Sequence, residues 1–146
     1  MSTAIMTAAA ALAGVLLSAL ITNWQNHTDR KRQQQDQAAK NAEALLGALA
    51  EHRQHQYLKI QTRRRSYDET KDDLKDRYAA RTHVTRARAA FLRTNRDPHL
   101  LELARQAVDT SFALGDTPDN QLQAAGDLAR EAHNALQNAA FHNRRT

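Results

Sequence analysis

The sequence predicts an all-α protein in which one N-terminal transmembrane helix continues into a cytoplasmic helical bundle or hairpin. The chain of 146 residues contains only four Gly and two Pro, and its long segments are rich in Ala, Gln and Arg. This composition favours helix. Residues 4–22 carry no charged side chain, and farther along the chain apolar residues recur at spacings of three and four. The chain has no cysteine, so disulfides and Cys-based metal sites are excluded.

The first predicted element is a membrane anchor over residues 1–28 with a short outer end. The 19 uncharged residues from 4 to 22 are enough to cross a hydrocarbon core of about 30 Å at about 1.5 Å per helical residue. A tryptophan follows at the depth of the membrane interface, where its amphipathic ring is favourable. The residues that define this span are Ala4, Leu12, Gly14, Leu17, Ile21 and Trp24.

Two other interpretations of this segment stay open, namely a cleaved signal peptide and a buried core helix. The small residues Ser18 and Ala19 offer a cleavage site, but no basic residue precedes the apolar run. A buried helix would be unusual because the chain is otherwise so polar. Ala10, Gly14 and Ser18 are spaced by four and would let two helices approach closely, which makes a homo-oligomer a candidate assembly.

A basic Gln/Arg-rich helical stem is predicted over residues 29–65, with nine Lys/Arg against four Asp/Glu. Its first basic cluster directly follows the uncharged segment. By the positive-inside rule, the N-terminus is then outside and the C-terminal domain cytoplasmic, in a single-pass protein of the cell membrane. The candidate contacts for lipid headgroups or phosphate are Arg30, Lys31, Arg32, Arg63, Arg64 and Arg65.

A helical domain is predicted over residues 66–146, with helices at about 67–95, 98–114 and 118–142. Ser66 and Glu69 have the spacing of a capping box, although whether the preceding helix bends or simply continues at this point stays open. The pair Asp97-Pro98 suits the start of the second helix, and Gly115 suits its end. The last helix opens in the same manner at Thr117-Pro118-Asp119.

Each predicted helix has a candidate packing face. The stem has Leu45, Leu46 and Leu49, continued weakly by Tyr57 and Ile60, and the next helix has Tyr67, Leu74, Tyr78, Val84, Ala87 and Phe91. The most regular pattern predicts a packing seam on the last helix. Its residues are Leu122, Ala125, Ala129, Ala132 and Leu136. The last two helices therefore form a predicted antiparallel hairpin against the longer helix before them.

No set of residues predicts a reaction, a metal site or a cofactor. His52 and His55 are three residues apart on a helix and could ligate a metal, but a chain with seven His produces such pairs by chance. Asp68, Glu69, Asp72, Asp73 and Asp76 are interleaved with Lys and Arg, so a solvated ion-paired face is favoured over acid–base chemistry. We therefore expect a protein that is not an enzyme.

Nucleic acid is a weakly supported candidate partner. Arg77, Arg81 and Arg88 fall near one helical face and could follow a line of phosphates. Aromatic residues placed for base stacking are lacking, however, and residues 97–146 hold seven acidic against four basic side chains. A solvated or partner-binding face is the alternative interpretation.

The layout as a whole resembles that of small single-span membrane proteins of actinobacteria. The chain has an apolar N-terminus containing GVLLSALITNW, a basic Gln-rich stem and an Ala/Arg-rich helical hairpin, and Arg outnumbers Lys by 16 to 5. In length and layout it is similar to the spread (Spd) proteins of Streptomyces conjugative plasmids. No functional residues are carried over from this resemblance.

The resemblance implies a non-enzymatic, membrane-anchored accessory protein for conjugative plasmid transfer or spread within a mycelium. Such a protein would act through contacts with other transfer or membrane proteins. Two alternatives stay open, namely a membrane-tethered scaffold or interaction protein of a mobile element, and a secreted helical protein with a cleaved leader.

Overall fold

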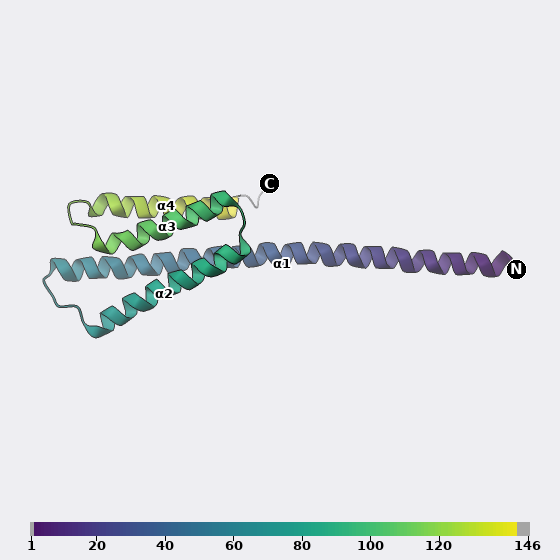
Figure 1. Cartoon of the computed structure of the whole chain (residues 1–146), viewed down its shortest axis with the longest axis horizontal. Helices are drawn as coiled ribbons and strands as arrows, with labels where there is room; N and C mark the ends of the chain where they lie inside the picture. Colours follow the sequence, from purple (N-terminus) through teal and green to yellow (C-terminus); the bar gives the residue numbers. More distant parts are fainter. Residues whose placement is uncertain (1, 143–146) are drawn as a thin grey trace. The chain divides into compact units, whose positions relative to one another are not determined.

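The computed structural model describes the backbone of residues 2–142 and the side chains of residues 18 and 20–142. Within these residues the chain forms helices joined by loops and contains no strand, which confirms the predicted all-α class (Figure 1). The elements are α1 (Ser2–Arg64), α2 (Lys71–Thr94), α3 (Pro98–Ala113), the short 3-10 helix η1 (Leu114–Asp116) and α4 (Leu122–His142).

The chain divides into two compact units, Met1–Asp36 and Gln37–Thr146. The boundary falls inside α1 and differs from the predicted divisions after residues 28 and 65. The reason lies in the apolar residues Leu45 and Leu49 of the predicted stem, which are fully buried. The second half of the stem is therefore part of the helical domain.

The second unit is an up-down-up-down bundle of residues 37–64 of α1 with α2, α3 and α4. The amide Nδ2 of Asn41 donates to the carbonyl oxygen of Ala90 near the end of α2, and Glu51 meets His83 nearer its start, so α2 runs antiparallel to α1. The helices α3 and α4 pack side by side as an antiparallel hairpin (Figure 1), as the sequence predicted.

The core consists of two apolar clusters separated by a polar layer. The smaller cluster contains Ile60, Leu114 and Leu122. The polar layer contains His52, Gln56 and Ser111, all buried. The larger cluster contains Ala42, Leu45, Leu46, Ala48, Leu49, Val84, Ala87, Phe91, Ala104, Ala107, Val108 and Leu136. Much of this core is alanine, so its tight contacts come from close helix approach rather than from large side chains.

The sequence left open whether the first helix bends or continues near Ser66. In the structure α1 ends at Arg64 and a loop leads to α2. Ser66 has a left-handed backbone with φ of 53°. The amide of Ser66 donates to the carbonyl of Arg63, and the amide of Tyr67 donates to the carbonyl of Thr62, at 3.2 Å each. This is the Schellman pattern of a helix C-terminus. Ser66 therefore ends α1. Its capping-box spacing with Glu69 had predicted that it opens the next helix, and this prediction is wrong.

The capping box of α2 lies four residues later than predicted. The hydroxyl of Thr70 accepts a hydrogen bond from the amide of Asp73, and the carboxylate of Asp73 accepts one from the amide of Thr70, at 3.1 Å each. Tyr67 and Tyr78, predicted on the packing face, are 71% and 65% exposed. Val84, Ala87 and Phe91 are buried as predicted, and Ala80 completes the buried face of α2.

The start of α3 is as predicted, and its end at Ala113 lies one residue before the predicted end at 114. Asp97 is the N-cap and accepts from the amide of His99 at 2.9 Å, and Pro98 follows at the first helical position. Gly115, expected to end the helix, follows the C-cap Leu114 and lies in η1 with a negative φ. Its role is spatial, because a Cβ added to Gly115 would lie 1.8 Å from Oε1 of Gln56.

The helix α4 begins at Leu122, four residues after the predicted start at 118. Thr117 belongs to the end of the preceding helix, since its Oγ1 donates to the carbonyl of Ala113 at 2.9 Å. The carboxylate of Asp119 binds arginines of α1. The residues expected to cap α4 are thus engaged elsewhere, and a turn from Pro118 to Gln121 precedes the helix.

The described residues do not supply the predicted transmembrane helix. No helix in this part of the chain is long and apolar enough to cross a membrane. Four residues of the predicted span lie outside the residues whose side chains are described, namely Ala4, Leu12, Gly14 and Leu17. The same holds for Ala10 and Gly14 of the small-residue face. Ile21 and Trp24 are described and are 49% and 74% exposed.

Candidate functional site

The first candidate is the polar layer in the core, which is built around His52. Nδ1 of His52 lies 3.0 Å from Oγ of Ser111, and Nε2 lies 3.0 Å from Nε2 of Gln56. The Gln56 amide nitrogen can only donate, so Nε2 of His52 accepts and Nδ1 carries the proton. Burial, followed by the charges of Arg81 and His55, lowers the pKa of His52 from 6.5 to about 4. The imidazole is therefore neutral at physiological pH.

The surroundings hold this imidazole in place. Its ring lies 4.9 Å from the ring of Phe112, and the guanidinium of Arg81 covers that phenyl ring at 4.7 Å. Both ring nitrogens of His52 have protein partners, so neither is available to a ligand. His55 lines a separate small cavity beside Arg77, and no group of three His, Cys, Asp or Glu in the described residues is arranged for a metal.

The acidic cluster at the start of α2 is engaged in structural contacts. Asp73 is held in the capping box, and hydrogen bonds from Thr70 lower its pKa. Glu69 forms a two-pronged ion pair with Arg77. These contacts agree with the ion-paired face that the sequence favoured.

The arginine triplet at the end of α1 joins this helix to the loop before α4. Arg63 donates to Oδ1 of Asp119 at 2.6 Å, and Arg64 donates through Nε to Oδ2 at 3.2 Å. These hydrogen bonds, that of Arg63 first, lower the pKa of Asp119. Arg65 is exposed, as are Arg30, Lys31 and Arg32 on the first unit. Sequence reasoning did not foresee Asp119 as the partner of this triplet, because it lies 56 positions from Arg63 and 55 from Arg64.

The residues of the predicted seam on α4 lie on its inner side. Leu122, Ala129 and Leu136 are buried, and Ala125 and Ala132 are half-buried. Leu122 and Ala125 pack in the smaller cluster, and Ala132 and Leu136 in the larger one. The seam therefore spans the polar layer and contributes to both clusters.

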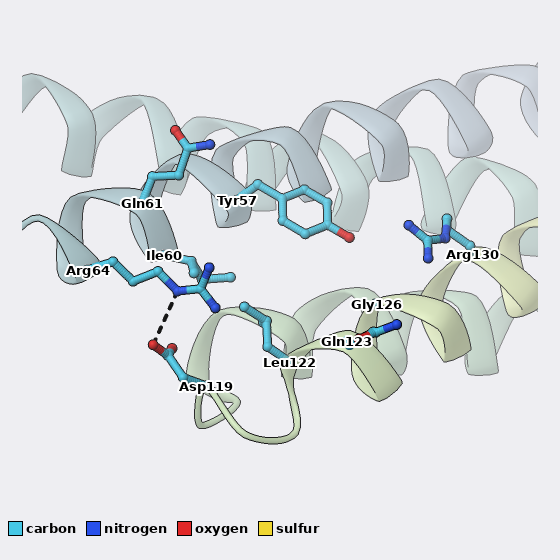
Figure 2. A pocket seen from close by; sticks show the side chains of 9 residues that line it. All are labelled: Tyr57, Ile60, Gln61, Arg64, Asp119, Leu122, Gln123, Gly126 and Arg130. Carbon is cyan, nitrogen blue, oxygen red and sulfur yellow. Dashed lines mark hydrogen bonds and ion pairs between the residues drawn. The ribbon is translucent and has the colours of Figure 1, made fainter.

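A second candidate site is a cavity of about 460 Å³ between α1 and α4 (Figure 2). Tyr57 and Ile60 of α1 line one side, and Leu122 and Arg130 of α4 line the other, with the Arg64–Asp119 ion pair at one end. A second cavity of about 500 Å³ adjoins it, since Tyr57, Gln61 and Arg130 line both, and it adds Arg53. We call these two cavities together the α1–α4 groove.

Sequence reasoning missed this groove. Its arginines, Arg53 and Arg130, are 77 positions apart, and the sequence analysis did not single out either of them. The signal that could have found them is their helical position, because Arg53 directly follows buried His52 and Arg130 directly follows buried Ala129. Such residues lie at the edge of a packing face, where long side chains reach the boundary between helices.

The comparisons with known proteins give a family but no individual relative. No curated protein and no solved structure is significantly similar to the chain. A model of the KilB plasmid transfer protein family matches residues 39–145, a region that contains the entire described bundle from Ala39 onward. This match confirms the plasmid-transfer part of the expected function, while similarity to spread proteins in particular stays a prediction. Because the match covers well over half of the sequence, the chain belongs to the KilB plasmid transfer protein family.

Proposed function

We propose that this protein is a non-enzymatic, membrane-anchored accessory component of conjugative plasmid transfer that acts through protein–protein contacts. Membership of the KilB plasmid transfer family carries this proposal. The polar side chains of the core fit this proposal as structural groups, because Ser111 and Gln56 hold the two ring nitrogens of His52. A bundle of this kind offers surfaces to partners.

The membrane anchor is proposed from the first segment of the sequence. Residues 4–22 are uncharged and are followed by Arg30, Lys31 and Arg32, which would hold the C-terminal domain in the cytoplasm. Leu20 and Trp24 are 67% and 74% exposed on α1. Large apolar side chains on an exposed helix surface support contact with an apolar phase.

The proposed partners are other transfer or membrane proteins and a second copy of the chain. A second copy could pair through the small residues Ala10, Gly14 and Ser18, which would allow close helix contact. Within a mycelium, such an assembly would support the spread of a plasmid after its first transfer.

The anchor is tested by fractionating cells that produce the full chain with a C-terminal tag. We expect the wild-type protein in the membrane fraction and a Leu12→Arg/Leu17→Arg variant in the soluble fraction, since each central charge costs about 3 kcal/mol of insertion free energy. A Gln33→Arg/Gln34→Arg variant is the matched control and should stay with the membrane. Equal partitioning of all three proteins, or a product cleaved near residue 20, would contradict the anchor.

The role in spread is tested by mating. Deleting the gene should shrink the area of recipient mycelium that acquires the plasmid, while first-contact transfer continues. The Leu12→Arg/Leu17→Arg variant should fail to restore spread, and the Gln33→Arg/Gln34→Arg variant should restore it. Undiminished spread without the gene would refute this function.

A further inference from the structure

The α1–α4 groove has a positively charged wall that the packing of the bundle does not explain. All residues that line its two cavities are described, and they include Arg53, Arg64 and Arg130. Of these residues Asp119 alone is acidic, and it already accepts hydrogen bonds from both Arg63 and Arg64. Outside the lining, the carboxylate of Asp127 pairs with Arg130. Within the described residues, Arg53 is therefore the arginine of the groove that has no carboxylate partner.

The charge that no carboxylate neutralises is that of Arg53, which lies near enough to Arg130 for the two charges to interact. Within the described residues, the side chain of Arg53 makes one hydrogen bond, from Nη1 to the carbonyl oxygen of Ala129 at 3.1 Å. A carbonyl satisfies a donor but does not neutralise the charge. Burial lowers the pKa of Arg53, Tyr57 opposes this effect, and the charge of Arg130 lowers the pKa further. An anion between the two guanidinium groups would relieve this repulsion.

Neutral donors face the same space. The Tyr57 hydroxyl and the side-chain amides of Gln61 and Gln123 have no hydrogen-bond partner within the described part of the chain. Figure 2 shows the hydroxyl of Tyr57 directed across the cavity toward Arg130. A Cβ added to Gly126 would lie 3.0 Å from this hydroxyl, so the glycine leaves room for the tyrosine against α4.

These groups define the chemistry of the ligand. Guanidinium groups, a phenol and primary amides together bind the oxygens of a phosphate. The cavities of about 460 and 500 Å³ are far larger than a bare phosphate needs and fall in the range of about 300–1,000 Å³ typical of small-molecule sites. The ring of Tyr57 offers a stacking surface, and the amides offer hydrogen bonds to a base.

We propose that the α1–α4 groove binds a nucleoside phosphate, either as a free nucleotide or as a residue of a single strand. The phosphate lies between Arg53 and Arg130, and the base lies beside Tyr57 and Gln61. A phospholipid headgroup fits less well, because its acyl chains would have to leave a groove whose walls carry arginines and glutamines. This inference does not depend on the membrane anchor.

The test measures binding by the full chain in detergent micelles at low salt. The probes are a fluorescent thymidine octanucleotide, AMP and inorganic phosphate. We expect Arg53→Gln and Arg130→Gln each to weaken octanucleotide binding by about tenfold, which is typical for the loss of a charge-assisted hydrogen bond. AMP should compete with the octanucleotide if the groove takes free nucleotides. Binding of the octanucleotide without AMP competition would assign the groove to strands.

The matched control is Arg86→Gln, because Arg86 is exposed on α2 and the substitution removes the same charge. Its affinity should stay within twofold of wild type. Equal weakening by all three variants would overturn the proposal in favour of non-specific charge. Preference for phosphatidylglycerol vesicles over the octanucleotide, lost in Arg53→Gln, would overturn it in favour of a lipid headgroup. Thermal unfolding of each variant separates lost binding from lost folding. The side chain of Arg130 is 61% exposed, so Arg130→Gln should fold and keeps the test valid if Arg53→Gln unfolds.

Discussion

The helix α4 packs through a regular series of apolar residues, whereas the helix α1 places polar side chains in the same kind of position. The buried residues of α4 are all apolar or glycine, namely Leu122, Gly126, Ala129 and Leu136. On α1, the buried series that begins at Leu45 continues through His52 and Gln56 before it reaches Ile60. The difference teaches that one bundle can join a helix with a simple periodic face to a helix whose face must also satisfy hydrogen bonds.

The largest expected loss of stability comes from a substitution in the larger apolar cluster, to which all four α-helices contribute. Phe91 of α2 is fully buried in the larger cluster, so Phe91→Ala should lower the free energy of unfolding by about 3–5 kcal/mol. Urea unfolding followed by circular dichroism measures the change. Leu92→Ala is the control, because Leu92 is 43% exposed, and it should cost less than about 1 kcal/mol. Similar losses for both variants would refute the assigned face of α2.

The polar layer should make the stability of the bundle depend on pH. The pKa of His52 is about 4 in the folded protein against 6.5 in the unfolded chain, so folding favours the neutral ring. This contribution is fully present above pH 6.5 and is lost as the pH falls to 4, with a total of roughly 3 kcal/mol.

Unfolding curves of the wild type and of His52→Gln between pH 7 and pH 4 isolate this contribution. The variant should be less stable at pH 7 and should lose less stability on acidification. His55→Gln removes the smallest of the three causes that lower the pKa of His52, so it should keep most of the wild-type pH dependence. If the free energy of unfolding of His52→Gln fell between pH 7 and pH 4 as steeply as that of the wild type, other groups would be responsible for the pH dependence.

Two glycines test the difference between a crowded and an open position. Gly115→Ala should lower the free energy of unfolding by about 1–3 kcal/mol, because the new methyl displaces Gln56 and Nε2 of His52 loses its hydrogen-bond donor. Gly47→Ala is the matched control on α1, where an added Cβ meets nothing within 4 Å. It should raise the free energy of unfolding by about 0.5–1 kcal/mol. Thermal unfolding measures both, and a stabilised Gly115→Ala would show that Gln56 repacks freely.

The smallest expected effect concerns the end of α1. Ser66 has a φ of 53°, a region that costs a non-glycine residue about 1 kcal/mol. Ser66→Gly should therefore raise the free energy of unfolding by up to about 1 kcal/mol, in part offset by the greater freedom of glycine in the unfolded chain. Ser66→Ala should give no gain. A gain with alanine as large as that with glycine would exclude backbone strain as the cause.

The parts of the fold that depend on local periodicity could be predicted from the sequence. The seam on α4 and the Asp97-Pro98 start of α3 both use residues within a few positions of one another. The starts of α2 and α4 could not be predicted, because competing contacts decide them. Ser66 is used to end α1, and Asp119 is drawn away by Arg63 and Arg64.

The candidate sites show the same limit more strongly. His52 was a recognisable residue, but its partner Ser111 is 59 positions away on another helix. The groove requires Arg53 and Arg130 to meet at the edges of two packing faces. Periodicity gives the face of each helix separately, and it does not say which edge of one helix meets which edge of the next.

The hydrogen bond between His52 and Ser111 also has a consequence for the register of the helices. A seam made largely of alanine has shallow ridges, and a slide of α1 by one turn, about 5.4 Å, would still bury apolar surface. Such a slide would separate His52 from Ser111 and leave buried polar atoms unpaired, at about 1–3 kcal/mol each. The polar layer thus selects one alignment of α1 against its neighbours. Any surface assembled from residues of two helices, such as the α1–α4 groove, depends on that alignment.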